Sequence, residues 1–261
     1  MGNKKNIRDF VEMKKRKEKV TWITSYDAQT ARLAEQAGID MILVGDSVGN
    51  NLLGYGSTIP VTMEEMIIFS KAVRRGAPNT FIFGDMPLGS YQASNEDAIN
   101  NSLRFIKEAG SDSVKCEGGI RMYDRVKAMN DAGIAVAGHI GYTPQSTNLE
   151  SVVQSKSLDN FKRLLEDAEA LQDAGAWAIL LEAVPNYPAG LIAEKLKIPV
   201  YGIGAGSKVD GVLAIVNDII GLGTFQSKFV KNYCNANEFM GGAIREYIKE
   251  IKEGKFPSKE H

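Results

Sequence analysis

The chain has 261 residues, 44% of them hydrophobic and 24% charged, so it is long enough for one barrel domain or two smaller domains. Its 31 basic and 32 acidic residues give a formal net charge of −1, which removes the overall attraction to nucleic acid or to an anionic membrane. The chain has only two cysteines, which argues against a disulfide framework, and only two histidines, which excludes a histidine-rich zinc site. No apolar run reaches the roughly 18 residues of a membrane span, so we expect a cytoplasmic protein.

The chain begins and ends with amphipathic helical patterns. Ile7, Phe10, Val11 and Lys14 have helical spacing, so we predict a short N-terminal helix that caps one end of the domain. Residues 238–255 predict a second amphipathic helix near the C-terminus. We assign no chemistry to either segment.

Between these two helices, an Ala-Gly pair repeatedly ends a helical pattern, and a short apolar run follows it. Glycine just past the end of a helix, followed by a strand, is typical of helix-to-strand units. The four pairs are Ala37-Gly38, Ala109-Gly110, Ala132-Gly133 and Ala174-Gly175.

Eight apolar runs are the predicted strands, and helical patterns lie among them. The strands are residues 20–24, 40–45, 80–84, 112–116, 134–138, 177–181, 199–203 and 218–222. The helices are residues 28–37, 62–74, 94–109, 121–132, 158–174 and 188–196. Because near-continuous apolar strands that alternate with helices indicate a parallel sheet, we predict an α/β fold, a (β/α)8 TIM barrel that forms a single domain over residues 1–261. A doubly wound open sheet is the alternative, but the glycine-rich segment 202–206 comes too late to open an early helix.

Polar residues follow these strands, and in a barrel they gather at the C-terminal mouth, where barrel enzymes place their chemistry. They are Ser25, Tyr26, Asp27, Asp46, Ser47, Asp85, Lys115, Glu117, His139 and Glu182. Any one of the Asp or Ser residues can instead be the N-cap of the next helix. Several carboxylates around one mouth repel one another and need a cation, and oxygen ligands with almost no histidine suit Mg2+. We expect Asp46 and Asp85 to bind the metal, with Glu117 binding directly or through water.

Lys115 and Glu117 lie two residues apart on one predicted strand, so both side chains point to the same face. An inward lysine needs an anionic partner. Together with a metal ion, Lys115 predicts a site for a small anion such as a 2-oxo acid. The alternative is a simple ion pair between Lys115 and a neighbouring carboxylate.

Glu182 and His139 complete the candidate site. Glu182 follows an apolar strand, a position that raises the pKa of a carboxyl as a general base near neutral pH requires. The alternatives for Glu182 are a metal ligand or a helix cap. His139 is either a contact to the substrate or a structural side chain.

Six motifs occur at these strand ends and in the loops that follow them. They are Val44-Gly45-Asp46-Ser47, Gly84-Asp85-Met86-Pro87 with Ser90-Tyr91-Gln92, Val114-Lys115-Cys116-Glu117-Gly118-Gly119, Gly138-His139-Ile140-Gly141-Tyr142-Thr143-Pro144-Gln145-Ser146, Leu181-Glu182-Ala183-Val184-Pro185 and Gly202-Ile203-Gly204-Ala205-Gly206. In this order and combination they resemble the ketopantoate hydroxymethyltransferases, also called 3-methyl-2-oxobutanoate hydroxymethyltransferases.

This resemblance implies a barrel of the phosphoenolpyruvate/pyruvate superfamily. It also implies a transferase of pantothenate biosynthesis that adds a one-carbon unit from 5,10-methylenetetrahydrofolate to the Mg2+-bound enolate of 3-methyl-2-oxobutanoate, giving 2-dehydropantoate. By motif match, Glu182 is the proton acceptor, and the acids of the metal site are Asp46, Asp85 and Glu117. The matched substrate contacts are Asp46, Ser47, Asp85, Lys115 and His139. The partners implied are the 2-oxo acid, the folate and further copies of the chain in a homo-oligomer, often a decamer, with no nucleic acid and no membrane.

Four departures from the family's pattern leave other functions open. The family often has other residues in the segment 149–155 around Val152, at residues 68–70, at Val212 and at Asn217, so a paralogue acting on another 2-oxo acid or an aldehyde is an alternative. A lyase or mutase of the same superfamily, acting on a C–C or P–C bond, is a second alternative. A non-catalytic assembly subunit is a third, and the retained candidates for metal ligands and base argue against it.

Overall fold

The computed structural model describes residues 4–146, 158–223, 230–258 and 260 of the chain. It divides into two compact units, Met1–Ala214 and Ile215–His261. All eight strands lie in the first unit. The single domain predicted over residues 1–261 stays a prediction.

Eight parallel strands close into a barrel in chain order, and the last strand pairs with the first. This arrangement confirms the predicted (β/α)8 TIM barrel. The strands are β1 (Val20–Thr24), β2 (Met41–Val44), β3 (Phe81–Asp85), β4 (Ser113–Glu117), β5 (Val136–Gly141), β6 (Ala178–Glu182), β7 (Val200–Ile203) and β8 (Gly211–Ala214).

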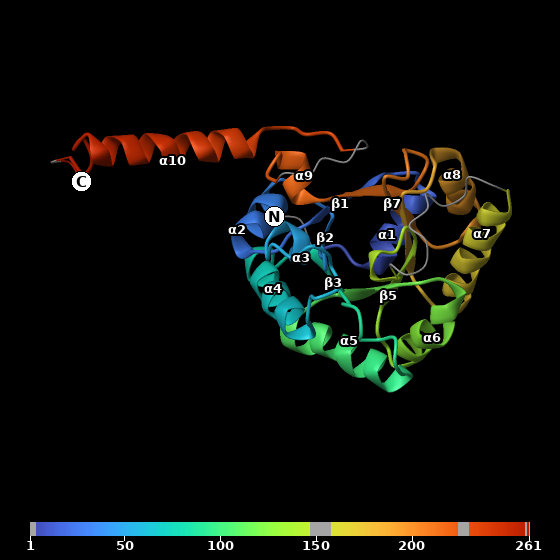
Figure 1. The fold of residues 1–261 in the computed structure, drawn as a ribbon. Coiled ribbons are helices and arrows are strands. Elements are labelled where there is room, and N and C mark those ends of the chain that lie inside the picture. Colours follow the sequence, from blue (N-terminus) through green and yellow to red (C-terminus); the bar gives the residue numbers. More distant parts are fainter. Residues whose placement is uncertain (1–3, 147–157, 224–229, 259, 261) are drawn as a thin grey trace. The chain divides into compact units, whose positions relative to one another are not determined.

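Helices alternate with the strands and surround the barrel (Figure 1). In the first unit they are α1 (Ile7–Lys15), α2 (Ala28–Gln36), α3 (Val48–Asn51), α4 (Met63–Gly76), α5 (Asn95–Ala109), α6 (Tyr123–Asp131), α7 (Leu158–Asp173) and α8 (Asn186–Lys195), with short 3-10 turns at Ile120–Met122 and Pro144–Ser146. The boundaries of α5 show how the sequence sets them. The Ser94 side chain accepts a hydrogen bond from the Asp97 amide at the start, and Gly110 ends the helix at a φ of 69°.

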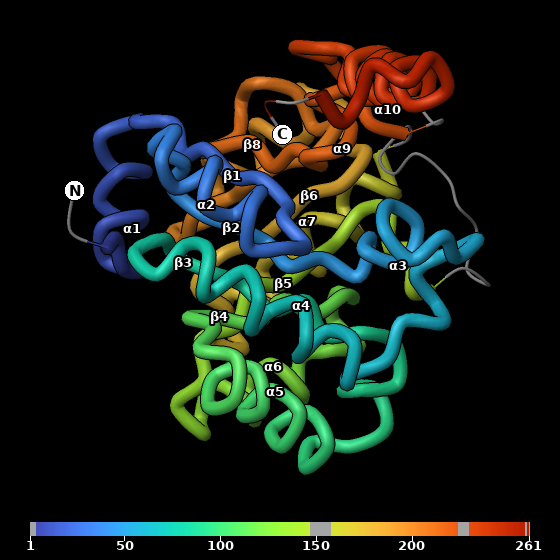
Figure 2. The backbone as a smooth tube through the Cα atoms, turned by 90° about the vertical axis from the view of Figure 1, so that its left-hand side faces the viewer, coloured from blue at the N-terminus to red at the C-terminus, as the bar shows by residue number. Residues whose placement is uncertain are grey.

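The N-terminal helix α1 closes one end of the barrel, as the spacing of its apolar residues predicts. Asn6 and Asp9 form a capping box at its start. Its buried Phe10 ring lies 5.2 Å from the Phe81 ring and 5.9 Å from the Trp177 ring, centroid to centroid. Figure 2 shows α1 and α3 at opposite ends of the barrel. Because α3 directly follows the carboxyl end of β2, α1 covers the amino-terminal end of the strands.

Aromatic side chains fill the barrel next to α1. Trp22 on β1 packs against Phe83 on β3 at 4.5 Å and against Tyr201 on β7 at 5.6 Å, centroid to centroid. Phe83 also stacks on Trp177 at 5.5 Å. All four side chains are buried, so this end of the barrel is a packed core and not a channel.

The last strand differs from the prediction. Residues 218–222 were expected to be the eighth strand, but β8 is Gly211–Ala214, and the apolar pair at 219–220 ends the short helix α9 (Val216–Ile220). A short apolar run does not distinguish a strand from a buried helical turn. In β8, Gly211 lies so close to β1 that an added Cβ would be 2.3 Å from the Val20 carbonyl oxygen, which favours glycine in this strand.

The second unit contains α9 and the C-terminal helix α10 (Ala236–Lys252). The predicted C-terminal helix is therefore confirmed, and it begins two residues before the expected start, with the Asn235 side chain accepting a hydrogen bond from the Glu238 amide. Among the residues described, no helix combines the length and the apolar character that a bilayer crossing requires.

Candidate active site

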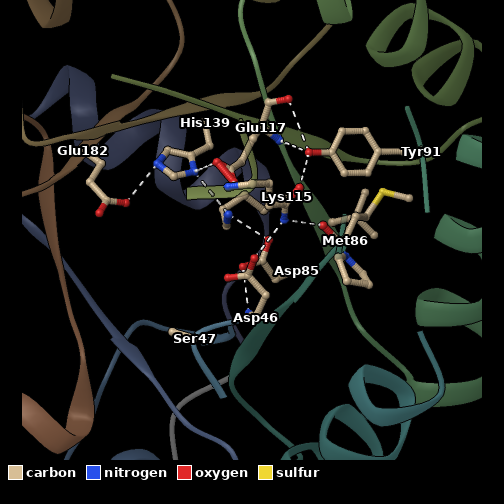
Figure 3. Close-up of polar contacts among 12 residues, drawn as sticks. Asp46, Ser47, Asp85, Met86, Tyr91, Lys115, Glu117, His139 and Glu182 are labelled. Atoms are coloured by element: carbon tan, nitrogen blue, oxygen red, sulfur yellow. Dashed lines mark hydrogen bonds and ion pairs between the residues drawn. The ribbon is translucent and has the colours of Figure 1, made fainter. Parts of the chain in front are cut away.

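The strand ends bring the predicted polar side chains together at the carboxyl-terminal mouth of the barrel (Figure 3). In the sheet, Asp85 of β3 is the neighbour of Lys115 of β4, and Glu117 of β4 is the neighbour of His139 of β5. Glu182 ends β6 beside the last residue of β5. The parallel register therefore places these residues, which are far apart in sequence, around one cluster.

A buried ion pair forms the centre of the cluster. The Lys115 Nζ lies 2.8 Å from the Asp85 Oδ1, and the Asp46 backbone amide donates to the Asp85 Oδ2 at 3.1 Å. Lys115 and Asp85 are 3% and 1% exposed, and Asp46 is 7% exposed. The ion pair between Lys115 and a neighbouring carboxylate, which was the alternative expected from the sequence, is therefore present in the structure. Lys115 also lies at the mouth of the barrel, so it could bind an anionic ligand there.

The charges of this cluster depend on one another. Burial raises the pKa of Asp85 well above its usual value, and the Lys115 ammonium opposes that rise. For Lys115, burial alone would lower the pKa, but the carboxylates of Asp85, Asp46 and Glu117 outweigh burial and raise the pKa. Burial also raises the pKa of Glu117. Lys115 is thus a permanent cation that holds several acids in a water-poor site.

His139 lies between Lys115 and Glu182. Burial lowers the pKa of His139 to about 4, and Lys115 adds to that effect, so the imidazole is neutral at pH 7. The Lys115 ammonium, 3.3 Å from the His139 Nδ1, can only donate, so Nδ1 accepts and the ring hydrogen is on Nε2. The Nε2 lies 3.2 Å from the Glu182 Oε2, but within the described part of the chain this buried nitrogen has no hydrogen-bond partner.

Glu182 has the pKa expected of a general base. Its side chain is 22% exposed, and burial raises its pKa to about 7, which the sequence interpretation predicted from the apolar strand before it. Figure 3 shows Glu182 on the opposite side of His139 from Glu117. The base candidate is therefore separate from the acids that surround Lys115.

The raised pKa of Glu182 predicts a stability effect that depends on pH. The pKa of this carboxyl rises from 4.5 in the unfolded chain to about 7 in the fold. Its contribution to the free energy of unfolding is therefore complete below pH 4.5 and is lost as the pH rises through about 7. Relative to wild type, we expect Glu182→Gln to gain about 2–3 kcal/mol in free energy of unfolding between pH 5 and pH 8. Urea unfolding at both pH values measures this gain, and an equal difference at both would contradict the raised pKa.

Two of the predicted strand-end residues have roles outside the cluster. Asp27 accepts hydrogen bonds from the amides of Gln29 and Thr30, so it is the N-cap of α2. Ser47 is half-buried, and its Oγ lies 2.9 Å from the Tyr26 hydroxyl, at the edge of the site. The simple capping interpretation is thus correct for Asp27, and Ser47 stays a predicted substrate contact.

Two residues of the cluster had no role in the sequence interpretation. Gln145, in the 3-10 turn after β5, donates from Nε2 to the Asp46 Oδ2 at 2.9 Å. Tyr91, in the loop after β3, donates its hydroxyl to the Gln145 Oε1 at 2.7 Å. Both residues stand in the motifs that carry the family resemblance, which was the signal that could have identified them.

The acids of the cluster have the chemistry of a hard-cation site. Glu117 Oε2 is buried and accepts no hydrogen bond from the described part of the chain. The carboxylates of Asp46 and Asp85 belong to the same cluster, with Asp46 linked to Glu117 through Gln145, and they supply the oxygen ligands that Mg2+ prefers. Within the described residues, no three Asp, Glu, His or Cys side chains already form a set of metal ligands. The residues therefore fit an ion that keeps water ligands and is held by one or two carboxylates, as Mg2+ usually is.

The departures from the family's pattern take different places in the structure, and residues 68–70 lie on α4. Val152 falls outside the described residues. Val212 lies on β8 with 49% of its side chain exposed. Asn217 is part of α9, in the second unit.

Comparison with solved structures relates the barrel to enzymes of low sequence identity. A phosphoenolpyruvate phosphomutase from Streptomyces platensis subsp. rosaceus superimposes with a TM-score of 0.64 at 16% identity, over 96% of this chain and 89% of that chain. A 2,3-dimethylmalate lyase, described as a PEP mutase/isocitrate lyase superfamily member, has a TM-score of 0.63 at 14% identity, over 97% and 89% of the two chains. At these identities the similarity shows a shared fold.

Sequence comparison is more specific. A family model described as ketopantoate hydroxymethyltransferase matches residues 4–259. A 3-methyl-2-oxobutanoate hydroxymethyltransferase from Alkaliphilus metalliredigens is 52% identical, over 100% of this chain and 93% of that protein. The protein of the same name from Thermosipho melanesiensis is 48% identical, over 98% and 97%. The chain therefore belongs to the ketopantoate hydroxymethyltransferase family.

Proposed function

We propose that this chain transfers a hydroxymethyl group to 3-methyl-2-oxobutanoate, with 5,10-methylenetetrahydrofolate as the one-carbon donor, water as a reactant, and 2-dehydropantoate and tetrahydrofolate as products. The observation that carries the proposal is the pairing of a buried cation, Lys115, with a separate carboxyl, Glu182, whose pKa lies near 7. Relatives at 46–52% identity carry the name of this transferase. In this proposal the chain works in the cytoplasm, in pantothenate biosynthesis.

The residues of the cluster divide the chemistry. The Lys115 ammonium binds the anionic 2-oxo acid and stabilises the negative charge that develops when the C–H bond next to the keto group breaks. Glu182 accepts that proton as a carboxylate. The neutral imidazole of His139 lies next to this base, with its Nε2 3.2 Å from the Glu182 Oε2. The carbon nucleophile then forms a C–C bond to the one-carbon unit. The two C–N bonds that join this unit to the folate break, water supplies the hydroxyl group, and tetrahydrofolate leaves with the two protons on its nitrogens.

A divalent cation fits the acids on the other side of Lys115. Asp46 and Asp85 are the proposed ligands of Mg2+, and Glu117 completes the site directly or through water. When bound, Mg2+ supplies Lewis-acid polarisation of the keto group, which makes the neighbouring C–H bond more acidic. Burial of these carboxylates favours a cation because it removes the water that would otherwise screen their mutual repulsion.

A two-stage assay tests this proposal. The purified chain, 3-methyl-2-oxobutanoate and Mg2+ are incubated in D2O, and we expect the NMR signal of the C3 hydrogen to disappear, with a much slower loss when EDTA replaces Mg2+. Addition of 5,10-methylenetetrahydrofolate should then produce 2-dehydropantoate, measured by mass spectrometry.

Other outcomes of this assay would favour the alternative functions. Exchange without product, or faster turnover of another 2-oxo acid such as pyruvate, would favour the paralogue. Cleavage of a C–C or P–C substrate would favour a lyase or mutase. No exchange with any 2-oxo acid would contradict an enzyme of this class.

Assembly remains part of the proposal. The family resemblance implies a homo-oligomer, often a decamer, and sedimentation of the purified chain measures the number of subunits. The other proposed partners are the 2-oxo acid and the folate, without nucleic acid or membrane.

A further inference from the structure

Gln145 is the most highly connected uncharged side chain of the cluster. It is 5% exposed, and its Nε2 donates to the Asp46 Oδ2 and to the Met86 carbonyl oxygen, both at 2.9 Å. Its Oε1 accepts from the Tyr91 hydroxyl at 2.7 Å. Its backbone amide donates to the Glu117 Oε1 at 2.9 Å. One residue thus contacts two of the three acids that we propose for the metal site.

Tyr91 fixes which way the Gln145 amide points. The Tyr91 oxygen accepts from the Glu117 backbone amide at 2.8 Å. Its single hydrogen has two acceptors within reach, the Gln145 Oε1 at 2.7 Å and the Glu117 carbonyl oxygen at 3.4 Å, and the shorter distance favours Gln145. Gln92 adds a second donor, with its Nε2 3.3 Å from the Gln145 Oε1. The side facing Tyr91 and Gln92 must therefore be the carbonyl oxygen, because an amide nitrogen there would face donors. The NH2 group of Gln145 is then directed at Asp46.

This direction matters because Asp46 adjoins a second acid. Two buried carboxylates side by side repel each other, and the Asp46 side chain, in the loop after β2, accepts its hydrogen bond from Gln145 in the turn after β5. The Gln145 hydrogen bond fixes one oxygen of Asp46 while the Asp46 amide binds Asp85. Outer partners that orient a ligand in this way typically change metal affinity or activity 10–100-fold when removed.

We propose that Gln145, held by Tyr91, is a positioning residue that orients the Asp46 carboxylate for a divalent cation before any substrate binds. The inference rests on the proposed function to the extent that Asp46 is a metal ligand. Its test therefore measures metal binding and not turnover. The competing explanation is that Gln145 only anchors the turn after β5, in which case its loss affects stability alone.

The experiment uses Mn2+ as the probe, because Mn2+ suits the same oxygen ligands and its free concentration is measured by electron paramagnetic resonance. The full chain is titrated without substrate. We expect Gln145→Met, which keeps the length of the side chain and removes its hydrogen bonds, to raise the Kd for Mn2+ by about 10–100-fold. Tyr91→Phe should raise it less, since Gln92 still contacts the Gln145 Oε1. The double variant should be no weaker than Gln145→Met, because Tyr91 acts through Gln145.

Gln172→Met is the matched control. Gln172 also uses its Oε1 to accept from a backbone amide, that of Lys197 at 2.7 Å, but it lies on α7 and contacts no member of the cluster. We expect this control to lower the thermal unfolding midpoint without changing the Kd for Mn2+. A Gln145→Met chain with wild-type Mn2+ affinity and only a lower midpoint would overturn the inference.

The remaining outcomes separate this inference from the proposed function. If Gln145→Met does not fold, Tyr91→Phe decides, and an unchanged Kd in that variant overturns the inference. If the wild-type chain binds no Mn2+, the metal site and the role of Gln145 are both wrong. If Mn2+ affinity falls as expected but the wild-type chain makes no 2-dehydropantoate, the proposed function is wrong and the role of Gln145 stands.

Discussion

Glu182→Gln is expected to slow the exchange of deuterium from solvent into 3-methyl-2-oxobutanoate by about 10²–10⁴-fold, the usual contribution of a general base. The amide has nearly the shape of the carboxyl but does not accept the proton. Because the pKa of Glu182 is about 7, the wild-type exchange rate should rise as the pH increases through 7, when Glu182 becomes ionised. The variant should lose this rise. NMR measurement of exchange from pH 5 to pH 9 tests both statements.

Two further measurements make this expectation specific. Binding of the 2-oxo acid, measured by calorimetry, should change little, because the charged contact comes from Lys115. Glu169→Gln is the matched control, since Glu169 is a partly exposed residue of α7 that pairs with Lys195 at 3.3 Å on the outside of the barrel. Unchanged exchange in Glu182→Gln would show that another group removes the proton.

Lys115→Met is expected to remove binding of the 2-oxo acid and to destabilise the chain by about 3–5 kcal/mol at pH 7, the usual cost of removing one partner of a buried ion pair. The Nζ lies 2.8 Å from Asp85, and its loss leaves the buried acids without their cation. Burial already raises the pKa of Asp85 and Glu117, and loss of the opposing Lys115 charge raises both further. An acid with a raised pKa in the fold stabilises it at low pH and loses that contribution as pH rises. The deficit should therefore shrink toward acidic pH, as urea unfolding at pH 5 and pH 8 would show.

A surface lysine gives the scale for this effect. Lys127 pairs with Asp131 at 3.0 Å one helical turn away, and its side chain is 52% exposed. Lys127→Met should change the free energy of unfolding far less than Lys115→Met does, since solvent screens exposed ion pairs of this spacing. If Lys115→Met cost as little as the control at pH 7, the acids around Lys115 would have to be protonated already.

Much of the barrel was predictable from the sequence because its repeating unit is local. The glycine of each Ala-Gly pair ends a helix, as Gly110 does at a φ of 69°, and a buried strand follows within a few residues. That reasoning failed for the eighth strand. Residues 211–216 and 219–220 are both apolar, so the sequence offers two candidates for the last strand and no local signal that separates them. The pairing that makes Gly211–Ala214 the strand is with β1, about 190 positions earlier in the chain.

The candidate site was predictable to the extent that strand ends define it. A parallel barrel carries Asp85, Lys115 and Glu182 to the same mouth whatever its loops do. The polar contacts supplied by loops were not predictable. Tyr91 and Gln145 lie 54 residues apart, and their hydrogen bond depends on two loop paths that no periodicity specifies. The sequence interpretation thus identified the strand-end residues and missed Tyr91 and Gln145, whose hydrogen bonds link the loops around them.

The aromatic packing beneath the cluster has a kinetic consequence. Phe10, Trp177 and their neighbours fill the barrel on the side of α1, so among the described residues that end is closed and the mouth with Lys115 is at the other end. If the proposed function is correct, the reactant that contacts Lys115 should therefore enter before the second reactant. Products should leave in the reverse order, the larger one first. Initial rates should accordingly follow an ordered sequential pattern, in which the acid that contacts Lys115 is the leading substrate.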